Sequence, residues 1–195
     1  MAHRLAQPMH RMIEVEQQMM TFFNDGGWAN RELDDPENCD FVAGNPQELA
    51  LPEYVDSLLR WTVPQDKDWY AYKFNEPYAQ EAAAAGLRER RGIPFEAEDI
   101  LVTDGGFAGL NLCIRTLTDP GDEVIFLTPP WFFYEAIILG GQANPVRVAV
   151  DYETWDLDLD AIEAAITERT TAIIVNSPNN PSGKIYPPET LRALA

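Results

Sequence analysis

Residues 170–175 read Thr-Thr-Ala-Ile-Ile-Val, a run in which every residue is apolar or β-branched. Such a run is typical of a strand that is buried on both faces of a parallel sheet. A helical pattern precedes it at residues 158–167. The apolar residues Leu159, Ile162 and Ile166 share one face of that pattern. A helix that leads into a buried strand indicates an α/β domain.

The same alternation of strand and helix extends back along the chain. Further apolar runs at residues 99–103, 123–127 and 145–150 predict three more strands. Helical patterns follow the first two runs, at residues 105–117 and 131–139. Strands that alternate with helices of this length predict an α/β fold with a mainly parallel sheet and helices on both faces.

The first half of the chain predicts helices and loops instead of strands. Helical patterns cover residues 10–24 and 76–91, and another short helix is expected after Pro52. The pattern at 76–91 ends in arginines and is followed by Gly92, which is a signal for the end of a helix. Residues 25–48 are rich in Gly, Asn, Asp and Pro and predict a loop.

Composition excludes several classes of protein. The 195 residues are 46% hydrophobic and carry a formal charge of −18, which indicates an acidic globular chain. Acids outnumber bases by 32 to 14, so no nucleic acid is expected as a partner. No membrane span is expected either, because Pro129, Pro130 and Glu135 interrupt the most apolar region. Cys39 and Cys113 match no zinc or redox spacing, so we expect reduced thiols in a cytoplasmic protein without a metal site.

Three of the predicted strands end in unusual residues, and ligands of parallel α/β sheets bind beyond the carboxyl ends of the strands. After residues 99–103 come Asp104, Gly105 and Gly106, which open a helix. Glycines let a phosphate approach backbone N–H groups, and a helix N-terminus favours an anion. A simple glycine turn with Asp104 as the helix N-cap fits this stretch equally well.

The other two strand ends carry aromatic and amide side chains. Trp131 follows the strand at 123–127 within a cluster of aromatic residues, where it can stack on a planar ring or belong to the core. Residues 176–183 read Asn-Ser-Pro-Asn-Asn-Pro-Ser-Gly. The prolines and asparagines of this loop predict a stiff segment that holds an amide side chain in a fixed direction.

Residues 176–183 resemble the Asn-Pro-Asn-Asn-Pro-Thr-Gly signature of the class I/II aminotransferases, which are fold-type I enzymes that use pyridoxal phosphate. Ser177 departs from the usual pattern, and Ser182 stands in place of threonine. Four more segments resemble motifs of this family in the same order, and these are residues 41–46, 102–110, 119–128 and 130–141. The resemblance covers about residues 40–195.

The resemblance implies which residues bind the cofactor. Gly105, Gly106 and Phe107 would offer backbone N–H groups to the phosphate of pyridoxal 5'-phosphate. Trp131 would stack against its pyridine ring, and Asn180 would donate its side-chain amide to the 3′ oxygen.

The resemblance also implies roles outside the cofactor ring. Gly44 would lie beside the substrate carboxylate. Tyr72 falls near the tyrosine that reaches the phosphate of the neighbouring subunit in a homodimer, although Tyr70 and Tyr78 are close and an ordinary packed tyrosine is an equal alternative. The resemblance places the Schiff-base lysine beyond Ala195, so no catalytic residue is expected in this chain.

The implied protein is a pyridoxal-phosphate-dependent aminotransferase that moves an amino group between an amino acid and a 2-oxo acid. Residues 1–48 would form an N-terminal arm with part of the small domain, and residues 49–195 an incomplete cofactor-binding domain that is inactive alone. One alternative is a lyase or acyltransferase of the same fold, since a fold does not determine the reaction. Another is a non-catalytic effector-sensing domain, although residues 1–40 are too short and acidic for an attached DNA-binding module.

Overall fold

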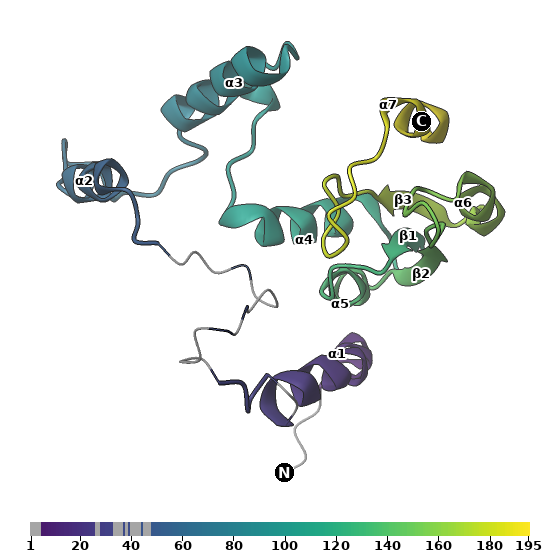
Figure 1. Ribbon diagram of the computed structural model, residues 1–195. Helices are drawn as coiled ribbons and strands as arrows, with labels where there is room; N and C mark the ends of the chain where they lie inside the picture. Colours follow the sequence, from purple (N-terminus) through teal and green to yellow (C-terminus); the bar gives the residue numbers. More distant parts are fainter. Residues whose placement is uncertain (1–4, 26–27, 33–36, 38, 40–43, 45–47) are drawn as a thin grey trace. The chain divides into compact units, whose positions relative to one another are not determined.

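The computed structural model describes residues 5–25, 28–32, 37, 39, 44 and 48–195. It divides into two compact units, one from residues up to 31 together with 104–195, and the other from residues 32–103. The first unit holds three strands, β1 (Glu123–Thr128), β2 (Asn144–Ala149) and β3 (Thr170–Ile174), and five helices, α1 (Gln7–Asp25), α4 (Gly105–Leu117), α5 (Tyr134–Gly140), α6 (Leu159–Ala165) and α7 (Pro188–Leu194) (Figure 1). The second unit holds α2 (Pro52–Trp61), α3 (Pro77–Arg91) and the short 3₁₀ helix η1 (Ala97–Asp99).

The three strands form a parallel sheet in the order β2-β1-β3. In the middle of the sheet, Ile125 of β1 is in register with Val146 of β2 and Ile173 of β3. Successive parallel strands must be joined by long crossovers, and the helices α5 and α6 lie in these crossovers. The predicted mainly parallel α/β fold is therefore confirmed.

Helices cover both faces of β1, whose alternate side chains enter two separate cores. Val124 and Phe126 pack with Ile138 of α5 and with a residue of α4. On the opposite face, Ile125 and Leu127 pack with residues of α6 and α7. Side chains of a strand alternate between its faces, so a strand with no polar alternation must be covered on both.

The strand at residues 170–175 is less buried than its sequence predicts. β3 pairs with β1 on one side, and its residues are half-buried except for the exposed Thr171. Both faces of β3 pack against a core, since Ile174 contacts one cluster and Ile173 the other. The expected full burial is not reached, because β3 is an edge strand of the described sheet. An edge strand has no neighbour on its second side to exclude water.

The strand predicted at residues 99–103 does not form, so this prediction is wrong. After η1 this segment is irregular, and side-chain amides bind its backbone in place of a neighbouring strand. The Val102 N–H donates to Asn75 Oδ1 at 3.0 Å, and Gln80 Nε2 donates to the Ile100 carbonyl at 2.7 Å. These bonds satisfy polar groups that a sheet ladder would otherwise satisfy.

Most helices form where the sequence predicts them. The Asp158 carboxylate accepts the Ala161 N–H at 2.9 Å and so caps α6 as expected. α3 ends at Gly92, which has a φ of 67° that favours glycine. α1 packs against α5, where Met12 lies over Gly140 and Phe23 contacts Phe132. None of the described helices could span a membrane.

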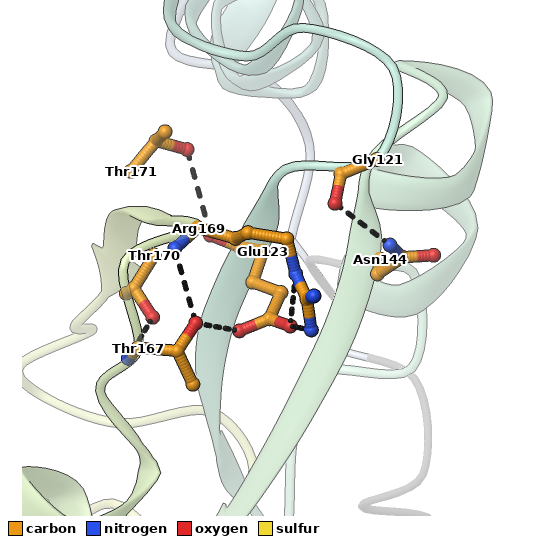
Figure 2. Close-up of polar contacts among 7 residues, drawn as sticks. All are labelled: Gly121, Glu123, Asn144, Thr167, Arg169, Thr170 and Thr171. Atoms are coloured by element: carbon orange, nitrogen blue, oxygen red, sulfur yellow. Dashed lines mark hydrogen bonds and ion pairs between the residues drawn. The ribbon is translucent and has the colours of Figure 1, made fainter.

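A polar network ties β1 to β3 at the amino end of the sheet (Figure 2). The carboxylate of Glu123, which is buried, accepts hydrogen bonds from Thr167 Oγ1 at 2.6 Å and from Arg169 Nε at 2.9 Å. The Glu123 N–H donates to the Arg169 carbonyl at 2.8 Å, and Thr171 Oγ1 donates to the Glu123 carbonyl. The hydrogen bonds from Thr167 and Arg169 lower the pKa of Glu123.

Stability should therefore depend on the charge of Glu123. Because its pKa is lower in the folded chain, the charged network stabilises the fold above the ordinary pKa of 4.5, and this stabilisation disappears as the pH falls through the folded-state pKa. We expect Glu123→Gln to lower the melting temperature at neutral pH and to flatten its fall at acidic pH, as measured by thermal unfolding across a pH series. Glu163→Gln, on the exposed side of α6, is the control. A variant at position 123 with the wild-type pH profile would contradict this role.

Candidate functional site

The candidate site lies at the carboxyl edge of the sheet. β1 ends at Thr128 and β3 at Ile174, and as parallel neighbours they end at the same edge. The first turn of α4 reaches this edge, because the ring of Phe107 contacts the ring of Trp131 edge to face with centroids 5.7 Å apart. Trp131 and Ile174 also pack against the same core cluster. The three motifs singled out in the sequence therefore belong to one edge of one unit.

The first turn of α4 begins with two glycines. Gly105 has a φ of 84°, which favours glycine, and no atom lies within 4 Å of a Cβ built on Gly105 or Gly106. The first N–H groups of a helix have no intrahelical acceptor and carry its positive dipole end. Asp104 occupies the N-cap position, but its carboxylate makes no capping hydrogen bond. The expected N-cap position of Asp104 is therefore confirmed, but without the side-chain hydrogen bond of a typical cap.

Trp131 is surrounded by other aromatic rings. It is half-buried, and it meets Phe107, Phe133 and Tyr134 at interplanar angles of 80°, 69° and 73°. Phe132 is tilted by 41°, so no described aromatic ring lies parallel to the indole. The ring packs against the core cluster, as the core alternative expects, and stacking on a cofactor ring stays a prediction.

The loop at residues 176–183 divides its asparagines between two tasks. Asn179 is buried, and its Nδ2 donates to Ser182 Oγ at 2.8 Å. The Asn179 N–H donates to the Lys184 carbonyl at 2.8 Å, and its carbonyl accepts the Gly183 N–H at 2.7 Å. Asn180 is exposed, and its side-chain amide makes no hydrogen bond to another described residue. Asn179 thus closes the loop, and Asn180 offers an unused amide.

Sequence reasoning missed the structural asparagines of this loop. Asn176 Oδ1 accepts the Asn180 N–H at 2.9 Å, and the hydrogen bonds of Asn179 are equally local. Asparagines in loops commonly bind nearby backbone groups, and that tendency was the only available signal. This tendency does not indicate which of the three asparagines is buried.

All three lysines of the chain have partners. Lys67 pairs with Asp68, and Lys73 pairs with Glu76 at 2.9 Å. The hydrogen bond to Glu76 raises the pKa of Lys73, which is opposite to the change that makes a lysine nucleophilic. Lys184 Nζ donates to the Thr154 carbonyl at 3.0 Å.

Two predicted site residues lie in the other unit. Gly44 is exposed, with no atom within 4 Å of a Cβ built on it. Tyr72 is fully exposed, so it does not pack against the described chain as an ordinary core tyrosine would. Its neighbour Tyr70 donates a hydrogen bond to the Thr62 carbonyl, and Tyr78 is exposed. The roles of Gly44 and Tyr72 stay predictions.

The two asparagines at the tip of the loop offer a matched test of this division. Asn179→Ala removes the hydrogen bond from its buried side chain to Ser182 Oγ and should cost about 1–2 kcal/mol in the free energy of unfolding. Asn180→Ala removes an exposed amide and should change that free energy by less than about 0.5 kcal/mol. Urea unfolding of both variants measures the difference. Equal losses would show that Asn180 also holds the loop.

Comparisons with known proteins show the family of this chain. Residues 57–195 match the family model described as aminotransferase class I and II. A probable aspartate/prephenate aminotransferase of Thermus aquaticus is 40% identical over 155 residues, which are 79% of this chain and 40% of the relative. An aspartate aminotransferase of Rhizobium meliloti is 32% identical over 78% of this chain and 37% of its own length.

A solved structure of an aspartate aminotransferase from Thermus thermophilus with maleate is similar in fold. It superposes with a TM-score of 0.72 at 29% identity, over 98% of this chain and 49% of that chain. The chain spans about two fifths of the length of the curated relatives it matches.

Proposed function

Since the chain belongs to the aminotransferase class I and II family, we propose that the protein is a pyridoxal-phosphate-dependent aminotransferase whose cofactor lies at the carboxyl edge of the sheet. One observation carries the proposal: a helix N-terminus, a fixed indole ring and an unused amide belong to the same edge. A phosphate, a pyridine ring and a ring oxygen need these three kinds of contact.

The residues present fit this cofactor. The N–H groups of Gly105, Gly106 and Phe107 would bind the phosphate at the positive end of α4. The side chain of Asp104 carries the charge that opposes a phosphate, so we expect cationic side chains of the remaining enzyme to complete the phosphate site. Trp131 would lie against the pyridine ring and keep water from that face.

Pyridoxal phosphate supplies an electron sink for the loss of the α-proton of an amino acid. The contribution of this chain is to bind and orient it. The Asn180 amide would donate to the ring oxygen and favour its negatively charged form, since an amide N–H stabilises an anion. The three lysines described above are occupied elsewhere, so the lysine that moves the proton would come from outside this chain.

Substrates and partners follow the same proposal. The names of the relatives support aspartate as an amino donor and a 2-oxo acid as the acceptor. Gly44 would lie beside the substrate carboxylate, and the exposed Tyr72 would reach the phosphate of a second subunit in a homodimer. We also propose a cytoplasmic location, because Cys39 and Cys113 are exposed and unpaired.

The activity is tested with the full-length protein loaded with pyridoxal phosphate. We expect aspartate and 2-oxoglutarate to yield oxaloacetate and glutamate, measured by a coupled dehydrogenase assay. A panel of other amino acids defines the donor. Release of carbon dioxide, ammonia or a condensed product without amino transfer would instead indicate a lyase or acyltransferase.

Trp131 should contribute to cofactor affinity. An aromatic stacking contact is worth about 0.5–1.5 kcal/mol beyond the area that it buries, so Trp131→Ala should raise the dissociation constant of pyridoxal phosphate roughly two- to tenfold or more. Phe133→Ala removes another ring of the same cluster and should mainly lower the melting temperature. Fluorescence titration of the apoenzyme measures the dissociation constant of pyridoxal phosphate in each variant. Equal affinities in wild type and Trp131→Ala would contradict the role.

The chain of residues 1–195 should not bind the cofactor covalently at a unique lysine. Lys184 lies in the signature loop, yet it donates to the Thr154 carbonyl and takes no nucleophilic position. The chain is incubated with pyridoxal phosphate, reduced with borohydride and mapped by mass spectrometry. We expect weak labelling at several lysines. Stoichiometric labelling of Lys184 together with amino transfer would place the catalytic lysine in this loop.

A further inference from the structure

The peptide unit between Asn179 and Asn180 is held at both of its polar ends. Its carbonyl oxygen accepts the Gly183 N–H at 2.7 Å. Its N–H, which belongs to Asn180, donates to Asn176 Oδ1 at 2.9 Å. A peptide unit is planar, so rotating this one would break both hydrogen bonds at once.

The residues on either side add to this constraint. The buried Asn179 is fixed by its hydrogen bonds to Ser182 and Lys184. Pro181 follows Asn180, and a proline restricts the backbone of the residue before it. The loop therefore determines the direction in which the Cα–Cβ bond of Asn180 leaves the backbone, while its amide stays exposed.

One of the two hydrogen bonds of this peptide unit depends on the side chain of Asn176. It is half-buried and comes two residues after the end of β3, so the sheet anchors it. The hydrogen bonds that close the loop between Asn179, Gly183 and Lys184 do not involve Asn176. Loss of its carboxamide would leave that closure in place and release only the N–H of Asn180.

We propose that Asn176 is a positioning residue, which orients the Asn180 amide toward the ring oxygen of the cofactor by accepting the Asn180 N–H. The inference rests on the proposed function, in which Asn180 donates to that oxygen. In this arrangement Asn176 would contact neither the cofactor nor the substrate. Its effect on the cofactor should therefore pass entirely through Asn180.

The experiment uses the full-length protein loaded with pyridoxal phosphate. The variants are Asn176→Ala, Asn180→Ala and the double variant, with Ser177→Ala as the matched control. Ser177 Oγ accepts the Tyr186 N–H at 3.1 Å. This hydrogen bond also joins a side chain of the loop to a backbone N–H, but it does not involve the peptide unit of Asn180. The readouts are the pH midpoint of the absorbance of the bound cofactor, its dissociation constant and the melting temperature.

We expect Asn176→Ala to shift the pH midpoint in the same direction as Asn180→Ala and to raise the dissociation constant about two- to tenfold, the effect of one hydrogen bond. The double variant should shift no further than Asn180→Ala alone, because coupled residues are not additive. Ser177→Ala should lower the melting temperature without moving the midpoint.

A midpoint that moves in Asn180→Ala but not in Asn176→Ala would overturn this inference and leave the proposed function intact. Additive shifts in the double variant would also overturn it, because Asn176 would then act on the cofactor independently. An unchanged midpoint in Asn180→Ala would refute the proposed role of Asn180 itself. If the alanine variant does not fold, Asn176→Ser repeats the test, because a serine hydroxyl is too short to replace the carboxamide.

Discussion

Burial of β1 on both faces is the constraint on which the rest of the unit depends. Residues 123–127 are all buried, and Val124, Ile125 and Phe126 have no exposed surface. Such a strand requires neighbours on both sides and helices on both faces. Helical crossovers make the neighbouring strands parallel, so the segments that follow β1 and β3 begin at one edge. The candidate site is thus a consequence of how the core is covered.

The two ends of the sheet have different chemistry. At the amino end, the charged Glu123 is satisfied by Thr167 and Arg169, which fixes β1 to β3 (Figure 2). At the carboxyl end, the candidate site offers backbone N–H groups, an indole ring and an amide, around Phe107, Trp131 and Asn180. The Asp104 carboxylate lies at the same helix start and makes no capping hydrogen bond. Neutral donors at a helix N-terminus suit an anionic ligand, whereas a fully paired charge suits a structural contact. This difference supports the proposed binding role of the carboxyl edge.

The sequence predicts those features that depend on neighbouring residues. Apolar runs locate β1, β2 and β3, Gly92 ends α3, and Asp158 caps α6. The sequence does not predict features that depend on residues far away in the chain. The segment before Asp104 has the sequence pattern of a strand, but its backbone groups form hydrogen bonds with the side chains of Asn75 and Gln80 instead. The partners of Glu123 lie more than forty residues along the chain. Identical residues in one loop, as in Asn176, Asn179 and Asn180, can be given separate tasks only by their contacts.

The most direct test is a crystal structure of the full-length protein with pyridoxal phosphate. The account predicts the phosphate at the first turn of α4, the pyridine ring against Trp131 and the Asn180 amide at the ring oxygen. It also predicts that the Asn176 carboxamide still accepts the Asn180 N–H in that complex. Cofactor bound away from the carboxyl ends of β1 and β3, with Trp131 and Asn180 untouched, would contradict it.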